Sequence, residues 1–327
     1  MLLHTVMGND SLKSIIVLGG ISILNSLFNR IIMTKFFFDY PIVILMLQMA
    51  VTLFSIEIAR LFNWVKLPAY TFQRGKDMFL PSILYALSTY LGMNCLDGIA
   101  MPLFPPIQRF CPLIVIAVGV YLHRQSFPNR QTLLLIEILC IGGALSSFYE
   151  LSIDMWSIVY GVGALVMHAV ALVMIERLHE NFPSTLDLVY MNSFNCLCLF
   201  LIADLVQDEI RDAFMYMITS MTMLFVTCLT ALVFIGVVFH TALFYCTTHA
   251  NALHASIVHN IAGALQIFVA YALSVYLFYD LAPTWTNILG VIICIAGAIG
   301  YYKITPFNDI NNKATPNANK FFMLGKA

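Results

Sequence analysis

Long apolar runs recur along the whole chain, and they constrain its fold more than any other feature. A helix needs roughly 20 apolar residues to cross the hydrocarbon core of a bilayer, and runs of about that length alternate here with short polar segments. Ten spans are expected, of which the eighth is overlong: 14–34, 41–61, 78–96, 101–122, 131–149, 155–175, 185–206, 217–246, 252–278 and 285–303. The sequence therefore predicts an all-α polytopic membrane protein with ten transmembrane helices.

Composition supports this class and argues against others. Of the residues, 61% are hydrophobic and 10% are charged, whereas soluble domains carry roughly 25% charged residues. The 16 Lys and Arg residues nearly balance the 17 Asp and Glu residues, so no basic surface for nucleic acid is expected. The eight cysteines lie in or at the ends of apolar runs and lack paired C-x-x-C spacing. We expect no metal, no cofactor and no enzymatic activity.

The positions of the Lys and Arg residues predict the orientation. An even number of spans places both termini on one side of the membrane, and basic loop residues gather on the cytosolic side. With cytosolic termini, the cytosolic face holds Lys13, Arg60, Lys66, Arg74, Lys76, Arg124, Arg130, Arg177, Lys303, Lys313, Lys320 and Lys326. The opposite loops hold only Lys35 and Arg211. Both termini are therefore expected in the cytosol.

Two strings repeat in the same order. The string VYL occurs at 120–122, followed by Pro128, and again at 275–277, followed by Pro283. The string CIGGAL at 140–145 is similar to CIAGAI at 294–299. The fourth and fifth spans thus resemble the ninth and tenth, and five helices per half imply an inverted-topology repeat. The expected organisation is a cytosolic segment 1–13, a first repeat 14–150, a second repeat 151–303 and a disordered cytosolic tail 304–327.

The fourth span opens with an unusual combination, MPLFPPIQRF at 101–110. Its prolines disrupt a helix, and Arg109 stays charged inside the membrane, where such residues face a cavity or a partner. A guanidinium suits carboxylate or phosphate. Arg109 is therefore either an anion contact beside a central cavity or half of a structural ion pair with Glu57 or Glu137. Arg60 offers Glu57 a local partner three residues away.

Further polar side chains fall inside the expected spans. A lone histidine or tyrosine in a membrane span more often makes a helix–helix contact than a ligand contact, but the set as a whole is more suggestive, because aromatic and amide groups stack on and hydrogen-bond to nucleobases. They are Asn29, Arg30, Tyr85, Tyr90, His168, Tyr190, Asn192, His240, His259, Asn260 and Gln266.

Four segments carry a family resemblance. NRIIMTKFFFDYPIVILMLQM (29–49) resembles the region around the first and second helices of nucleotide-sugar transporters, and MPLFPPIQRF resembles their fourth helix. CTTHANALHASIV (246–258) is similar to their eighth-to-ninth helix junction, and YMNS (190–193) to their Phe-Tyr-Asn-Asn motif. The chain thus resembles, over nearly its whole length, the UDP-sugar/GDP-mannose transporter branch of the drug/metabolite transporter superfamily.

The resemblance implies a five-plus-five inverted repeat in the Golgi or endoplasmic reticulum membrane. It also implies exchange of a cytosolic nucleotide sugar for a luminal nucleoside monophosphate, with Tyr190 and Asn192 at the base and Arg109 in the fourth-helix motif. A homodimer is left open. The expected substrate-binding residues are Arg109, Tyr190, Asn192, His259, Asn260, Asn29, Arg30, His240 and Gln266.

One departure from the family concerns charge. The family's ninth helix carries a lysine associated with the phosphates or sugar, whereas this chain reads SIVHNIAGALQ, with Ala262 or Gly263 at that place. Asn29-Arg30 also replaces an Asn-Lys pair. The phosphate-binding charge is then expected from Arg109, Arg30 or a protonated His259. Otherwise the protein is a relative that carries another anionic metabolite, or a non-transporting scaffold or receptor of the same fold.

Overall fold

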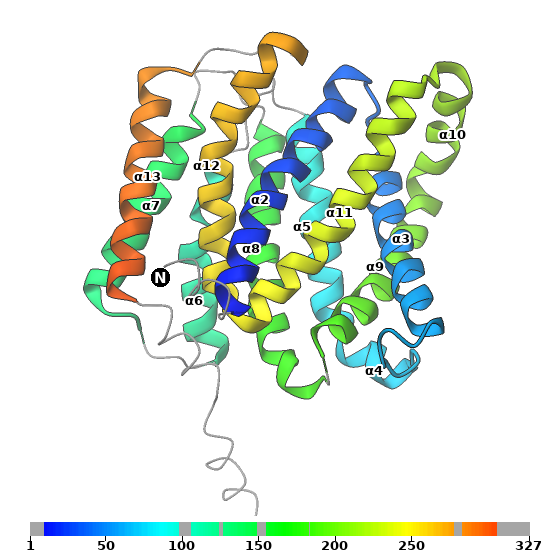
Figure 1. The fold of residues 1–327 in the computed structure, drawn as a ribbon, viewed down its shortest axis with the longest axis horizontal. Coiled ribbons are helices and arrows are strands. Elements are labelled where there is room, and N and C mark those ends of the chain that lie inside the picture. The colour runs from blue at the N-terminus through cyan, green and yellow to red at the C-terminus, as the bar shows by residue number, and fades with distance from the viewer. Residues whose placement is uncertain are drawn as a thin grey trace, which may run out of the picture.

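The computed structural model describes residues 10–97, 106–123, 127–148, 155–182, 184–277 and 283–305, and these residues form helices joined by short segments (Figure 1). The helices are α2 (Asp10–Arg30), η1 (Ile31–Lys35), α3 (Pro41–Leu61), α4 (Phe72–Asp77), α5 (Phe79–Asp97), η2 (Pro106–Phe110), α6 (Cys111–His123), α7 (Arg130–Ser146), α8 (Met155–Leu178), η3 (His179–Asn181), α9 (Thr185–Gln207), α10 (Glu209–Ser220), α11 (Met223–His249), α12 (Ala252–Leu277) and α13 (Trp285–Ile304). Each of the ten expected spans overlaps one of the longer helices. The all-α fold is therefore confirmed, and it is consistent with a polytopic membrane protein.

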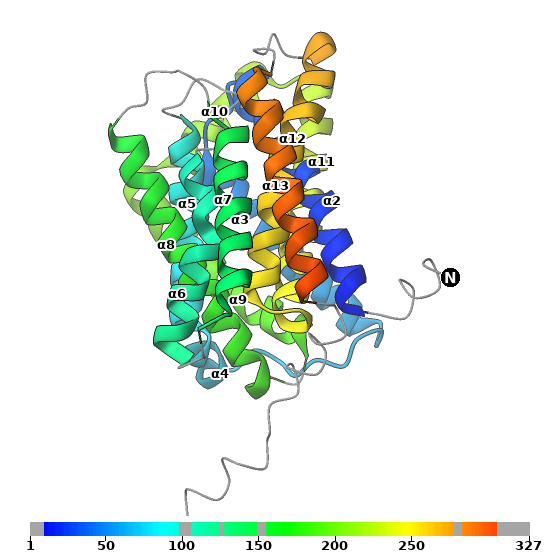
Figure 2. The ribbon, with the colours of Figure 1, turned by 90° about the vertical axis from the view of Figure 1, so that its left-hand side faces the viewer.

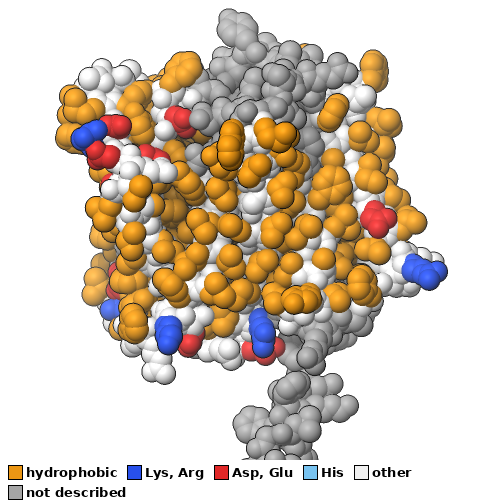
Figure 3. All heavy atoms as spheres, turned by 180° about the vertical axis from the view of Figure 1, so that it is seen from behind, with side chains coloured by type: hydrophobic (Ala, Val, Ile, Leu, Met, Phe, Trp, Pro, Cys, Tyr) orange, Lys and Arg blue, Asp and Glu red, His pale blue; other side chains and the backbone are white. Residues whose placement is uncertain are grey.

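Six of the described helices are long and apolar enough to cross a membrane by length and composition: Leu12–Met33, Pro41–Leu61, Ile158–Asn181, Thr185–Gln207, Met223–His249 and Trp285–Ile304. Two further apolar helices, Phe79–Met93 and Ile107–Leu122, are shorter. Hydrophobic side chains cover the middle of the face seen in Figure 3, and Lys and Arg lie at its margins: near the lower edge, at the right edge and at the upper left corner. Such a broad apolar surface suits lipid and not water.

The eighth expected span is corrected by the structure. The sequence predicted one helix over 217–246, but residues 217–220 end α10 and a new helix, α11, begins at Met223. Thr222 fixes the start of α11. Its side-chain oxygen accepts a hydrogen bond of 3.2 Å from the backbone N–H of Phe225 and so caps the helix. The first helix also begins at Asp10, four residues earlier than expected.

The helices run along one common direction, which defines two ends of the bundle (Figures 1 and 2). In Figure 1, α2 begins and α13 ends at the lower end, where α4 also lies, whereas α10 lies at the upper end. Three basic residues belong to the lower end: Arg60 in the last turn of α3, and Arg74 and Lys76 in α4. The two ends of the described chain thus share the side that carries these basic residues.

The fourth span is irregular, as its prolines predict. A 3₁₀ turn, η2, precedes α6, and Pro112 is the second residue of α6, where no backbone donor is needed. Pro102 and Pro105 lie outside the described residues, as does most of the expected tail. Gln108 and Arg109 therefore lie on a turn that is not α-helical.

Candidate functional site

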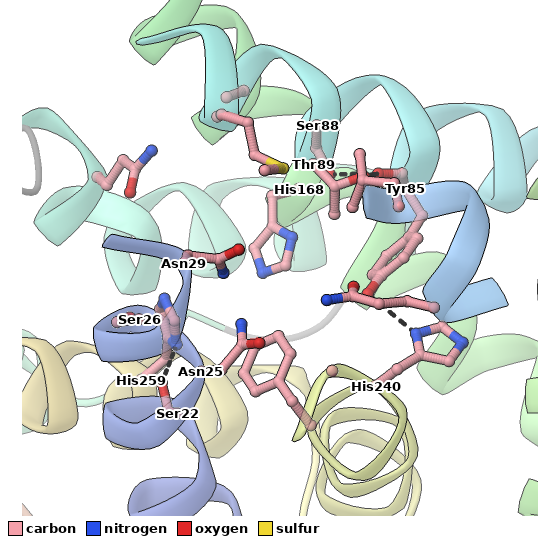
Figure 4. Close-up of a pocket in the computed structure, with 18 of the residues that line it drawn as sticks. Ser22, Asn25, Ser26, Asn29, Tyr85, Ser88, Thr89, His168, His240 and His259 are labelled. Carbon is pink, nitrogen blue, oxygen red and sulfur yellow. Dashed lines mark hydrogen bonds between the residues drawn. The ribbon is translucent and has the colours of Figure 1, made fainter. Parts of the chain in front are cut away.

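A cavity of about 180 Å³ lies between helices from both halves of the chain. Residues of α2, α3, α5, η2 and α6 line it from the first half, and residues of α8, α11 and α12 from the second. Figure 4 shows Asn29 and His168 on one side of an open space and Tyr85 with His240 on another. Of the nine residues expected to bind substrate, five line the cavity: Asn29, Arg30, His240, His259 and Gln266.

One face of α2 forms a polar wall of the cavity. Ser22, Asn25, Ser26 and Asn29 are spaced i, i+3, i+4 and i+7, so they share one side of the helix. Ser22 Oγ and His259 Nδ1 of α12 are joined by a hydrogen bond of 2.8 Å. The Oδ1 atoms of Asn25 and Asn29 are buried without a donor among the described residues. Leaving such an acceptor unsatisfied costs about 1–3 kcal/mol.

Arg30 ends this wall. It is the last residue of α2, where the chain passes into the π-helical η1, and its side chain is only 5% exposed. It is the single Lys or Arg among the described cavity-lining residues, and no Asp or Glu is among them. A permanent charge in a low-dielectric cavity attracts an anion more strongly than it does in water. The described lining therefore presents one fixed positive charge among neutral hydrogen-bonding groups.

A hydrogen-bonded group faces α2 across the cavity. His240 Nδ1 on α11 lies 2.9 Å from the Tyr85 hydroxyl on α5. The other ring nitrogen of His240, Nε2, lies 3.4 Å from Asn192 Nδ2 and 3.5 Å from Ser193 Oγ, both on α9. His240 and Tyr85 line the cavity, whereas Asn192 stands behind His240 and is not among the lining residues. Asn192 thus reaches the cavity only through the imidazole.

Arg109 is not among the residues that line the cavity. Its side chain is 2% exposed, and its Nε donates a hydrogen bond of 3.2 Å to Ser147 Oγ. Asn260 Nδ2 donates to the Arg109 carbonyl oxygen over 2.6 Å. A Cβ atom built on Gly263 of α12 would lie 1.6 Å from Arg109 Nη1. The guanidinium therefore occupies the space above Gly263, and this placement favours a structural role for both Arg109 and Asn260.

Tyr190 lies apart from the cavity, near the lower end. Its hydroxyl donates a hydrogen bond of 2.5 Å to Glu57 Oε1, and Arg60 lies 3.3 Å from the other oxygen of the same carboxylate. The local Glu57–Arg60 pair anticipated from sequence is confirmed. Tyr190 and Arg109 thus stand on separate polar clusters.

Several lining residues were missed by sequence reasoning: Ser22, Asn25, Ser26, Gln48 and Gln108. A signal for the α2 residues existed, because a polar stripe at helical spacing in an otherwise apolar span marks a face turned away from lipid. Gln48 had none. It reaches the cavity because Gly236 of α11 has no side chain, and a Cβ atom there would lie 2.2 Å from the Gln48 amide.

No protein-family model matches the chain. Similar proteins are the UDP-galactose/UDP-glucose transporter 7 of Arabidopsis thaliana, 23% identical over 81% of this chain and 81% of that protein, and the UDP-sugar transporter sqv-7 of Caenorhabditis elegans, 23% identical over 89% and 88%. A probable sugar phosphate/phosphate translocator of Arabidopsis thaliana is 24% identical over 67% of this chain and 62% of its own length. A solved crystal structure covers 90% of this chain with a TM-score of 0.64 at 12% identity, which shows a shared fold.

Many transporters place their substrate site in a polar cavity between two halves of a helical membrane bundle. The similar proteins give a more specific comparison. The chain's similarity to UDP-sugar transporters and sugar phosphate translocators confirms the resemblance seen in the sequence, to the nucleotide-sugar transporter family of the drug/metabolite transporter superfamily.

Proposed function

We propose that this chain is an alternating-access antiporter that exchanges a cytosolic nucleotide sugar, most favourably a UDP-sugar, for a luminal nucleoside monophosphate. It acts in the Golgi or endoplasmic reticulum membrane with ten spans in two inverted five-helix repeats, 14–150 and 151–303, and with both termini in the cytosol. The observation that carries the proposal is the cavity between the two halves, whose described lining holds Arg30 as its one fixed charge. The UDP-sugar transporters among its relatives supply the substrate class.

Arg30 is the proposed phosphate contact. Of the three expected sources of positive charge, Arg30 and His259 line the cavity and Arg109 does not. An arginine side chain is a permanent cation, and both exchanged ligands carry phosphate. His240 and Tyr85 are proposed to meet the base, with Asn192 orienting His240.

The proposed transport cycle is supported by a difference between the two ends of the bundle: the cavity lies toward the upper end, and polar contacts join the halves at the lower end. Arg30 ends α2 at the upper side of the molecule, so the cavity extends toward that side. At the lower end, contacts between α3 or α4 and α9 join the two halves, among them Tyr190–Glu57 and Arg74–Asp187. We propose that this conformation is closed toward the cytosol. A cavity of 180 Å³ is smaller than the roughly 300–1,000 Å³ of pockets that enclose whole ligands, so movement of the halves is expected on binding.

Exchange in liposomes tests the function and the role of Arg30. Purified protein is reconstituted into liposomes preloaded with UMP, and uptake of radiolabelled UDP-glucose and UDP-galactose is measured. Arg30→Gln removes a charge-assisted contact worth about 1.5–3 kcal/mol, so uptake is expected to fall by about 10- to 150-fold. Arg211→Gln, at a side chain that is 70% exposed, is the matched control and retains uptake. Unchanged uptake by Arg30→Gln would remove Arg30 from the site.

A second function is favoured by a specific observation. Sugar phosphate/phosphate translocators are among the relatives, and the chain lacks the ninth-helix lysine of nucleotide-sugar transporters. This alternative is exchange of a sugar phosphate for inorganic phosphate. A thermal-shift panel separates the two, because a ligand at 100 times its Kd stabilises by about 2.7 kcal/mol. Stabilisation by UMP and UDP-sugars supports the first function, and stabilisation by sugar phosphates alone supports the second. Binding without exchange in liposomes indicates a scaffold.

A further inference from the structure

We infer that the polar face of α2, formed by Ser22, Asn25, Ser26 and Asn29, is the subsite for the hydroxyl groups of the sugar moiety. This inference rests on the proposed function and specifies how one part of the substrate is recognised. It applies to a nucleotide sugar and to a sugar phosphate alike, because both carry a polyhydroxyl ring next to a phosphate. None of the residues of this face except Asn29 was expected from the sequence to bind substrate.

The argument begins with the two amides. The Oδ1 atoms of Asn25 and Asn29 are buried and have no donor among the described residues. Both side chains line the cavity, and Figure 4 shows them beside its open space. A buried acceptor without a donor is uncommon in a folded protein and calls for an explanation, such as a ligand. These amides are therefore arranged to receive hydrogen bonds from something inside the cavity.

The required donors identify the ligand group. Asn25 and Asn29 are four residues apart, so the two amides are separated by about 6 Å along the helix. Ionised phosphate offers acceptors only, and a uracil ring offers a single N–H. A sugar presents several hydroxyls spread around its ring, and each hydroxyl both donates and accepts. Each amide likewise offers an acceptor and two donors, so hydroxyls satisfy both Asn25 and Asn29.

The position of Arg30 fits the same arrangement. It adjoins Asn29 at the end of α2 and lines the same cavity. In a nucleotide sugar and in a sugar phosphate, a phosphate group is bonded directly to the sugar ring or to its side carbon. A phosphate held by Arg30 therefore places the ring against the neighbouring amides of α2. Tyr85 and His240 lie on the far side of the space and are left for the remainder of the ligand (Figure 4).

Binding to the purified full-length protein tests the inference. Dissociation constants are measured by calorimetry for UDP-glucose and UMP, and in parallel for glucose 6-phosphate and inorganic phosphate. Asn25→Ala and Asn29→Ala are each compared with Asn181→Ala, the same change at an exposed residue away from the cavity. Loss of one hydrogen-bonded contact is expected to weaken the sugar-bearing ligand about tenfold. UMP, which lacks the hexose of UDP-glucose, and inorganic phosphate, which lacks any sugar, should each bind within about twofold of wild type.

Thermal unfolding of the ligand-free variants separates binding from folding. Because the Oδ1 atoms of Asn25 and Asn29 accept no hydrogen bond among the described residues, Asn25→Ala and Asn29→Ala should unfold at or above the wild-type temperature. A selective loss of affinity in the pair UDP-glucose and UMP indicates a nucleotide sugar as substrate. A selective loss in the pair glucose 6-phosphate and inorganic phosphate indicates a sugar phosphate. Equal weakening of the hexose-bearing ligand and of its partner without a hexose, or no weakening, overturns the inference while leaving the proposed function standing. Wild-type protein that binds none of the four ligands overturns both.

Discussion

At the scale of single residues, the most informative pair is Arg109 and Gly263. The sequence marks Arg109 as a buried charge and marks residues 262–263 as the place of a missing lysine, but it does not connect the two. In the structure the Arg109 guanidinium lies above Gly263, so one side chain from η2 fills the space that a larger residue on α12 would need. The arginine and the glycine are therefore explained together.

This contact predicts a structural consequence of removing Arg109. Arg109→Ala deletes the hydrogen bond to Ser147 and leaves a void inside the helix contacts, so we expect a loss of roughly 2–4 kcal/mol. Thermal unfolding in detergent measures it, with Arg211→Ala at the exposed rim as the control. If Arg109→Ala unfolds like wild type but does not transport, Arg109 is the anion contact that the sequence alone had favoured.

At the scale of elements, the contact between α7 and α13 depends on glycine. A Cβ atom on Gly142 would lie 2.4 Å from the backbone nitrogen of Cys294, and one on Gly290 would lie 2.3 Å from the backbone nitrogen of Ser146. Both distances are far below van der Waals contact and involve backbone, so the helices would have to separate. Small residues allow this close approach in lipid, where packing and not water exclusion drives helix association.

Adding a methyl group at this contact should therefore destabilise the bundle. Gly142→Ala and Gly290→Ala are each expected to lower stability by about 1–3 kcal/mol through overpacking. Gly20→Ala is the matched control, because no heavy atom lies within 4 Å of its added Cβ, and alanine favours a helix by up to about 1 kcal/mol over glycine. Unfolding temperatures that fall equally in all three variants would contradict the role of the α7–α13 contact.

At the scale of the whole molecule, the lower end is held by polar contacts between distant segments. Arg74 of α4 pairs with Asp187 of α9, whose side chain is fully buried, and the Arg74 guanidinium lies 5.6 Å from the centre of the Phe182 ring. Asn195 Nδ2, also on α9, donates a hydrogen bond of 2.9 Å to the Gly75 carbonyl oxygen in α4. These contacts join the two halves on the side that is expected to face the cytosol.

Breaking the ion pair should open that end. Asp187→Asn removes the charge that Arg74 faces, so the equilibrium is expected to shift toward a conformation open to the cytosol. Hydrogen–deuterium exchange over residues 72–77 should then quicken about tenfold, which corresponds to about 1.4 kcal/mol. Asp212→Asn, at an exposed side chain of α10, is the control. Exchange at 72–77 that matches wild type would mean that Arg74–Asp187 does not hold this end closed.

Much of the fold could be predicted because its cause is local. Each span is set by a run of apolar residues, and the helix positions therefore agreed with the sequence to within a few residues at most ends. The exception at 217–222 has a specific reason: apolar residues continue through the junction, and only the capping of α11 by Thr222 divides it. The site was less predictable. Gln48 and Tyr190 are both polar residues in apolar spans, yet only Gln48 lines the cavity.

The sequence by itself determined the membrane class, most of the helices and the family resemblance, since these depend on the length, composition and order of segments along the chain. Only the tertiary structure decided which polar groups share a cavity. It placed Arg30 and the amides of Asn25 and Asn29 around one space, and it placed Arg109 above Gly263 and Tyr190 against Glu57. The physical reason is that a polar side chain in a membrane must find a partner, and whether that partner is another helix or a ligand depends on how the helices pack.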